Sequence, residues 1–111
     1  MIIAVDFDGT LADTDATRIY TANENLIVKL IILRQKGNKV ILWTCREGDR
    51  LNDAIEFCRK YGLEFDAVND NLPRYKAFGL NPRKIFANIY IDDAASGIEE
   101  FLKDIETYMI G

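Results

Sequence analysis

Two aspartates lie one residue apart near the start of the chain, directly after an apolar run. Residues 2–7 are predicted to form a strand, and Asp6, Asp8, Gly9 and Thr10 stand at its end. Alternation along a strand would point Asp6 and Asp8 to the same side. At about 4 Å and an effective dielectric constant near 20, two carboxylates repel each other by about 4 kcal/mol. This arrangement therefore predicts a bound cation that offsets the repulsion.

Polar side chains also end two later predicted strands. Thr44 ends the strand predicted over residues 39–44, and Asp92 and Asp93 follow the one over residues 85–91. Because the functional crevice of a doubly wound sheet lies beyond the carboxyl ends of its strands, these side chains are expected at one rim. The chain has no histidine, so the acids favour a hard cation bound through oxygen, and Mg²⁺ fits best. The predicted metal ligands are Asp6, Asp8, Asp92 and Asp93.

Groups that could hold an anion accompany these acids. Gly9 lets the backbone turn close to a ligand, and Thr10 and Thr44 each offer a hydroxyl. Arg46 is a candidate phosphate or substrate contact, or else the ion-pair partner of Glu47 or another surface acid. A lysine from the loop before the fourth strand would balance the remaining charge. Such a set would hold a phosphoryl group against a carboxylate nucleophile.

The elements that must position these residues alternate between strands and helices. Strands are predicted over residues 2–7, 39–44, 65–68 and 85–91. Helices are predicted from an Asn23 cap to Lys36 before Gly37, from an Asp49 cap to Gly62, and along an apolar face from Ile98 to Met109. The pattern predicts a doubly wound, Rossmann-like α/β fold, with a parallel sheet in a three-layer α/β/α arrangement. A single domain of residues 1–111 is expected.

Composition narrows the classes of partner. The net charge of −4 argues against a protein that coats nucleic acid, and no segment approaches the length of a membrane span. Cys45 and Cys58 lack metal-ligand spacing, so reduced thiols and a cytoplasmic location are expected. Residues 26–33 are apolar nearly all round their predicted helix, which makes one edge a candidate contact with a second copy of the chain.

These motifs resemble those of the haloacid dehalogenase-like (HAD) phosphohydrolases. The stretch DFDGT at residues 6–10 is similar to their first motif, and Thr44 in ILWTCR to the second. Lys76 or Lys84 would be the third, and the Asp92-Asp93 pair in YIDD the fourth. The resemblance covers nearly the whole chain in the right order.

The resemblance implies a Mg²⁺-dependent phosphatase. Asp6 would form an aspartyl-phosphate, and Asp8 would protonate the leaving oxygen and then activate water. Mg²⁺ would contact Asp6, the backbone carbonyl of Asp8 and, directly, Asp93; Asp92 would then contact the lysine or a bound water.

Two lysines remain candidates for the third motif. Small members of the family often carry an Arg-Lys pair before the last strand, which matches Arg83-Lys84. If residues 85–91 are fully extended, however, Lys84 begins about 23 Å from the far end of that strand. Lys76, in the loop after the third strand, is slightly preferred.

The resemblance also implies a protein without a separate cap domain. Cap insertions would fall at residues 11–22 or 69–81, and both stretches are too short for an independent domain. An open site of this kind suits a large or protruding phosphate ester, or a partner subunit that supplies the lid, and a small-molecule phosphate ester is also a candidate substrate.

Other functions compete with the phosphatase. A phosphate-accepting receiver domain would need its acceptor aspartate at the end of the third strand, where this chain has Val68-Asn69. A non-catalytic interaction module and a phosphotransferase of the same fold remain alternatives. Several polar or aromatic residues are expected to have ordinary structural roles. They are Asp13 and Asp15 as solvated loop charges, Trp43 in the core, and Asn69 and Asn71 in a turn.

Overall fold

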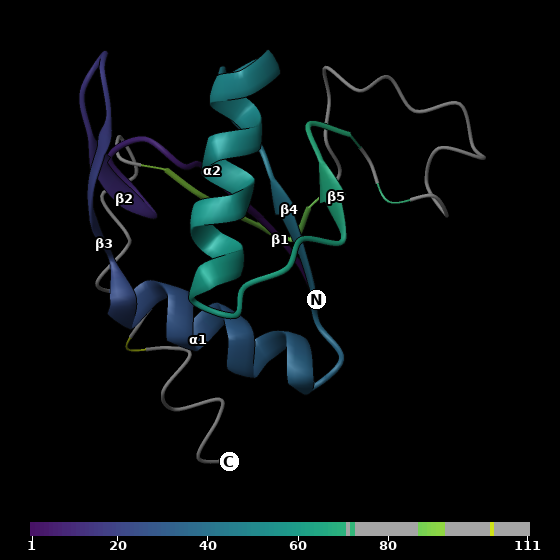
Figure 1. Ribbon diagram of the computed structural model, residues 1–111. Coiled ribbons are helices and arrows are strands. Elements are labelled where there is room, and N and C mark those ends of the chain that lie inside the picture. The colour runs from purple at the N-terminus through teal and green to yellow at the C-terminus, as the bar shows by residue number, and fades with distance from the viewer. Residues whose placement is uncertain (71, 73–86, 93–102, 104–111) are drawn as a thin grey trace.

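The computed structural model describes residues 1–70, 72, 87–92 and 103 (Figure 1). This part of the chain contains both strands and helices. In order they are β1 (Ile2–Val5), β2 (Ala12–Thr14), β3 (Ile19–Ala22), α1 (Glu24–Gln35), β4 (Lys39–Leu42), α2 (Gly48–Lys60), β5 (Ala67–Val68) and β6 (Ile89–Ile91).

Four parallel strands form the central sheet in the order β5-β4-β1-β6. Val5 of β1 lies level with Leu42 of β4 on one side and with Ile91 of β6 on the other. The chain proceeds from β1 through β4 to β5 and then returns to pair β6 with the opposite side of β1. This reversal makes the β1–β6 border the topological switch point of the sheet. The predicted doubly wound α/β fold is confirmed.

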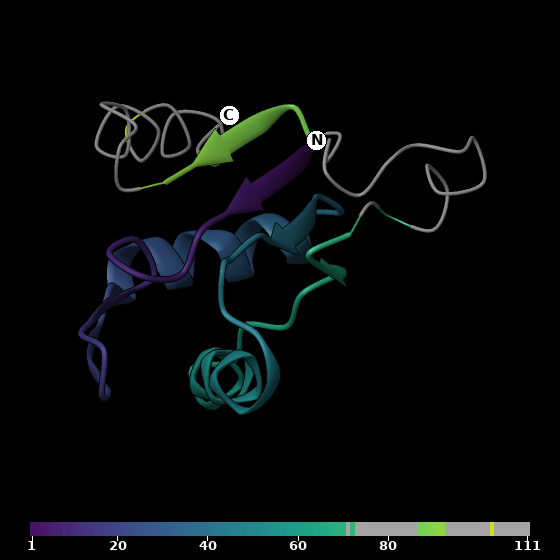
Figure 2. The same cartoon turned by 90° about the horizontal axis from the view of Figure 1, so that it is seen from above.

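Side chains that alternate along the strands supply the apolar residues of both faces of the sheet. Ile3 and Val5 face the main core, into which α1 and α2 also pack Leu30 and Cys58. Both helices therefore cover the same face of the sheet (Figure 2). The opposite face buries Ile2, Ala4 and Ile41. Because both faces of β1 are buried, the strand contains no polar residue.

The helix boundaries follow from local chemistry. Asn23 caps α1 as predicted, since its side chain accepts a hydrogen bond from the N–H of Leu26 at 3.4 Å. Gly37 and Gly62 follow the two helices with φ of 96° and 91°, values that glycine adopts readily. The predicted Asp49 cap is wrong, because α2 begins at Gly48 and Asp49 lies in its first turn. A negative charge there still favours the helix N-terminus.

An ion pair joins α1 to the sheet. The Arg34 guanidinium donates two hydrogen bonds to Asp66, of 3.1 and 2.9 Å, and the N–H of Val40 donates to the same carboxylate at 2.7 Å. Burial raises the pKa of Asp66, but the bonds from Arg34 and Val40 outweigh it and lower that pKa overall. The segment before β5 is thereby held against β4.

A two-stranded antiparallel hairpin, β2–β3, separates β1 from α1 and lies beside α2 (Figure 1). The sequence pattern predicts only a loop, or a site for a cap insertion, over residues 11–22. Asp15 is exposed as predicted, but it organises the hairpin turn, because its carboxylate accepts hydrogen bonds from the backbone of Thr17 and Arg18 and from the Tyr20 hydroxyl. These bonds lower the pKa of Asp15, and those from Thr17 contribute most.

All four predicted strands are shorter in the structure. The first ends at Val5 because residues 7–11 fold into a turn, and the second ends at Leu42. The third begins at Ala67, and residues 87 and 88 precede the last, which begins at Ile89. Within the described residues no helix is both long and apolar enough to cross a bilayer. Several predictions lie outside the described residues: Lys76, Lys84, Asp93, Asn71 and the final helix over residues 98–109.

Candidate functional site

Asp6 stands at the carboxyl end of β1, at the switch point of the sheet. Its N–H donates a 2.9 Å hydrogen bond to the carbonyl of Ile91, the last residue of β6. Its carboxylate accepts a 2.7 Å bond from the N–H of Phe7. Phe7 is fully buried and packs edge-on against Phe57 of α2, so it anchors the loop that presents the acids on either side of it.

A pocket of about 230 Å³ opens at this end of the sheet. The side chains lining it come from the ends of β1, β4 and β6. Asp6, Thr44 and Asp92 all border the pocket, as the strand-end argument predicts. The structure therefore brings together one predicted residue from each of three separate strands.

Two aromatic side chains border the same pocket. Trp43 is 40% exposed and Tyr90 51% exposed, and their rings meet edge to face with centroids 6.3 Å apart. The prediction that Trp43 belongs to the core is wrong, because β4 ends at Leu42 and Trp43 lies beyond the sheet, at its rim. Its N–H still donates to the carbonyl of Val5, which fixes it beside Asp6.

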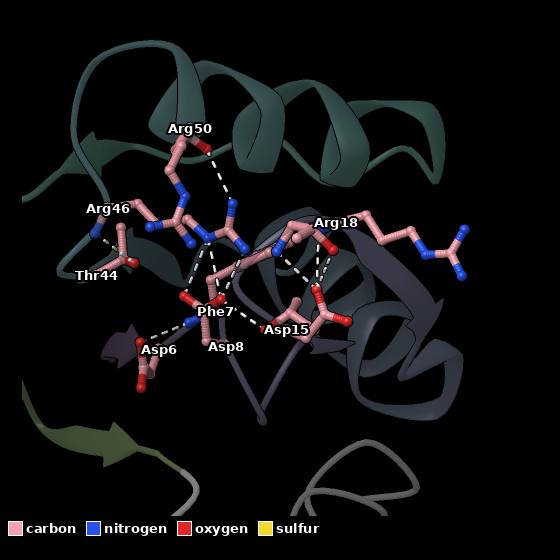
Figure 3. Close-up of polar contacts among 10 residues, drawn as sticks. Asp6, Phe7, Asp8, Asp15, Arg18, Thr44, Arg46 and Arg50 are labelled. Carbon is pink, nitrogen blue, oxygen red and sulfur yellow. Dashed lines mark hydrogen bonds and ion pairs between the residues drawn. The ribbon is translucent and has the colours of Figure 1, made fainter.

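Asp8 does not line this pocket but is held by Arg46. The Arg46 Nε lies 3.1 and 3.0 Å from the two carboxylate oxygens of Asp8, and its second terminal nitrogen lies 2.7 Å from Oδ1. The Thr14 hydroxyl of β2 donates a further 2.7 Å bond. Figure 3 shows Asp8 facing the Arg46 guanidinium, with Asp6 to one side of that pair. Arg46 thus supplies positive charge that offsets the repulsion between the two aspartates.

The Asp8–Arg46 pair is asymmetric in its burial. Arg46 is 6% exposed and stacks over the Phe7 ring at 5.0 Å, whereas the Asp8 side chain is 39% exposed. Hydrogen bonding from Arg46, helped by Thr14 and by the charge of Arg50, lowers the pKa of Asp8 despite partial burial. The carboxylate form of Asp8 is therefore favoured at neutral pH.

A tight turn follows the acids. The N–H groups of Thr10, Leu11 and Ala12 all point to the carbonyl of Phe7, and Gly9 has a φ of 75°. Thr10, predicted to contact an anion, is only 2% exposed and borders neither hollow at this rim, because the turn folds it inward. Its hydroxyl has no hydrogen-bond partner among the described residues, which carries a cost of about 1–3 kcal/mol.

Thr44 is fixed by a residue expected only to form a turn. The Asn69 side chain accepts a 2.7 Å hydrogen bond from the N–H of Thr44, and Asn69 itself has a φ of 50°. The Thr44 hydroxyl in turn accepts a 3.2 Å bond from the N–H of Arg46. Asn69 therefore ties the loop after β4 to the end of β5 and determines where Thr44 lies.

The oxygen donors of the pocket suit a hard cation. Asp6 and Asp92 border one hollow, and Mg²⁺ needs only one or two protein carboxylates because water and phosphate oxygens complete its shell. No group of three or more acidic, cysteine or histidine side chains gathers as a metal site within residues 1–70, 72, 87–92 and 103. The donor chemistry fits Mg²⁺, and Asp93 lies outside the described residues.

No protein-family model matches this chain, and no curated protein matches it. A solved structure does: that of a conserved protein coded by a locus of Bacteroides thetaiotaomicron, with 39% sequence identity and a TM-score of 0.79. The match covers 98% of this chain and 94% of the other. The two proteins belong to one family.

Two features of this family member that sequence reasoning missed are long-range contacts. The pairing of Asp8 with Arg46 spans 38 positions, and the bond from Thr44 to Asn69 spans 25. No sequence motif marks Tyr90 as a residue of the site. The one usable signal was the placement of Asn69 at a strand end, since asparagine tolerates positive φ better than most residues.

Proposed function

We propose that this protein is a Mg²⁺-dependent phosphohydrolase, similar to the HAD phosphatases, that cleaves phosphate monoesters through an aspartyl-phosphate on Asp6. The observation that carries the proposal is the shared pocket of Asp6, Thr44 and Asp92 at the switch point of the sheet. Ligands of doubly wound folds bind at such points. The family resemblance of the sequence motifs points to the same residues.

Each residue has a definite role in this proposal. A carboxylate oxygen of Asp6 attacks phosphorus, the bond to the ester oxygen breaks, and that oxygen takes a proton from Asp8. Water then attacks phosphorus and gives its proton to Asp8, and the Asp6–phosphate bond breaks to release phosphate. The Thr44 hydroxyl and the Gly9 turn would hold the phosphoryl oxygens, and Mg²⁺, held by Asp6, the Asp8 carbonyl and an acid of the Asp92–Asp93 pair, would neutralise their charge.

The ion pair with Arg46 affects which protonation state of Asp8 is available at each step. Arg46 stabilises the Asp8 carboxylate, which is the form that accepts a proton from water. Donation of a proton to the leaving group requires the neutral form, so the Arg46 contact has to weaken when an ester is bound. Arg46 would then be available to contact the substrate, the role expected for it from the sequence.

Phosphate release from p-nitrophenyl phosphate tests the proposal. Turnover is expected with Mg²⁺ and is expected to vanish in EDTA and in the Asp6→Asn variant. Asp13→Asn serves as the matched control, because Asp13 is an exposed acid of β2 that borders neither hollow. Circular dichroism of each variant checks the fold. Equal turnover with and without Mg²⁺, or full activity of Asp6→Asn, would contradict the proposal.

A further inference from the structure

A second hollow, of about 340 Å³, lies between the β2–β3 hairpin and α2. Residues 15–19 of the hairpin form one wall and α2 forms the other, and Arg46 lies at the border. We refer to this hollow as the hairpin cleft. The loop after β4 connects the two hollows, because Thr44 borders the first pocket and Arg46 borders the hairpin cleft.

The position of Asp8 connects the hairpin cleft to the proposed reaction. Under the proposed function, the oxygen of the leaving group must come within hydrogen-bond reach of Asp8. Asp8 faces Arg46, which borders the hairpin cleft, and its other side-chain partner is Thr14 of the hairpin. A leaving group attached at that oxygen would extend toward the hairpin cleft if it leaves Asp8 on the Arg46 side.

Positive charge is concentrated where Arg46 and Arg50 meet. Both side chains border the hairpin cleft, and Figure 3 shows the Arg50 guanidinium extending from α2 toward that of Arg46. Figure 3 also shows both guanidinium groups on the same side of the Asp8 carboxylate, and the charge of Arg50 is among the causes that lower the pKa of Asp8. One carboxylate thus faces two guanidinium groups. Within the described part of the chain, Arg50 makes no ion pair of its own.

The location of Arg50 is unfavourable for the helix that carries it. Arg50 lies in the first turn of α2, where the helix dipole disfavours a cation. The acids around the hairpin cleft do little to neutralise it. Asp15 accepts the hydrogen bonds of the hairpin turn and Glu56 pairs with Arg59, which leaves Asp53 as the remaining acid of the cleft. An exposed cation placed against both the dipole and a second arginine is suited to receiving an anion.

We propose that the leaving group of the substrate lies in the hairpin cleft and carries a second anionic group, a carboxylate or phosphate, that Arg50 binds. The inference rests on the proposed function and narrows it to phosphate monoesters with an anionic leaving group. Two other cations border the hairpin cleft. The Arg18 guanidinium stacks over Tyr20 and extends away from Asp8 (Figure 3), and Lys60 is the last residue of α2, at the opposite end of the helix from Arg50. Arg50 is therefore the residue that discriminates between substrates.

Matched esters test the inference. Phenyl phosphate, 3-carboxyphenyl phosphate and 1,3-phenylene bisphosphate differ only in the second group. The kcat/KM of at least one anionic ester is expected to exceed that of phenyl phosphate by tenfold or more, and the larger gain identifies the preferred anion. In Arg50→Gln this ratio should fall toward one. Lys39→Gln is the control, since it removes one positive charge from an exposed position at the start of β4, outside the cleft, and its ratio should not change.

The outcomes separate the inference from the function on which it rests. If all three esters are cleaved but the ratio is near one, or if Arg50→Gln lowers all three equally, the inference is wrong and the phosphatase proposal stands. If no ester is cleaved, the phosphatase proposal fails. Calorimetric binding of 3-carboxyphenylphosphonate and phenylphosphonate then tests the hairpin cleft directly. Tighter binding of the carboxylated compound, lost in Arg50→Gln, would support it, and equal binding would overturn it.

Discussion

Replacing Arg46 with methionine should reveal how much the Asp8–Arg46 pair contributes to the free energy of unfolding. Methionine keeps an unbranched apolar chain against Phe7 but removes the guanidinium that makes three contacts of 2.7 to 3.1 Å with Asp8. Hydrogen bonds to charged groups contribute about 1.5–3 kcal/mol. Asp8 is 39% exposed and Arg46 only 6%, so solvent screens the pair in part. We expect a coupling free energy of about 2 kcal/mol at pH 7.

A double-mutant cycle measures this coupling. The variants are Arg46→Met, Asp8→Asn and the combination, unfolded in urea with EDTA present and followed by circular dichroism. Arg59→Met with Glu56→Gln is the matched control. Both of those side chains are at least half exposed, so the control coupling should stay below about 1 kcal/mol.

The dependence of this coupling on pH has a definite sign. The folded-state pKa of Asp8 lies below the ordinary value of 3.8, chiefly through Arg46. Stabilisation by the pair is therefore complete above that ordinary pKa and is lost as the pH falls through the lowered one. A coupling under about 0.5 kcal/mol at pH 7, or one that grows on acidification, would refute the reasoning.

Two further predictions concern residues outside the pair. Iodoacetamide at pH 8 should label the exposed Cys45 in the native protein but not Cys58, because burial leaves Cys58 inaccessible and raises its pKa to about 12; labelling of both at similar rates on peptide mapping would contradict this. Asn69→Ala should lower the free energy of unfolding by about 2 kcal/mol, through left-handed strain and the lost bond to Thr44, and Asn69→Gly by less. Urea unfolding of both variants checks this, and equal losses would mean that the backbone of Asn69 is not strained.

The sequence predicts the core of the fold well, because its apolar runs are long enough to be unambiguous. The apolar stretch of β1 and the Asn23 cap of α1 lie where the pattern places them. The shared rim of Asp6, Thr44 and Asp92 followed from strand order alone, since parallel strands that end in polar residues must present them at one edge.

The parts that the sequence does not predict depend on short or distant contacts. Strands β2 and β3 have three and four residues, too few for alternation to be distinguished from a loop. The pattern predicts a core position for Trp43 because it extends the strand to residue 44. The strand ends at Leu42, and a shift of one residue is enough to move Trp43 from the strand to the rim beyond it. The choice of Asp8 as the partner of Arg46 depends on how the turn after β1 folds, which no local pattern specifies.

The bond from the Asp6 amide to Ile91 has a consequence for how the molecule moves. It fastens the main chain of the nucleophile proposed above to a strand of only three residues, which β1 holds on one side. Any event that draws Asp92 toward a ligand also pulls on the main-chain bond between Ile91 and Asp6. Conversely, fraying of β6 would release the main chain of Asp6 and so displace its carboxylate, even though no contact of that carboxylate itself is broken. Amide hydrogen exchange at Asp6 is thus a gauge of how firmly the two strands stay together.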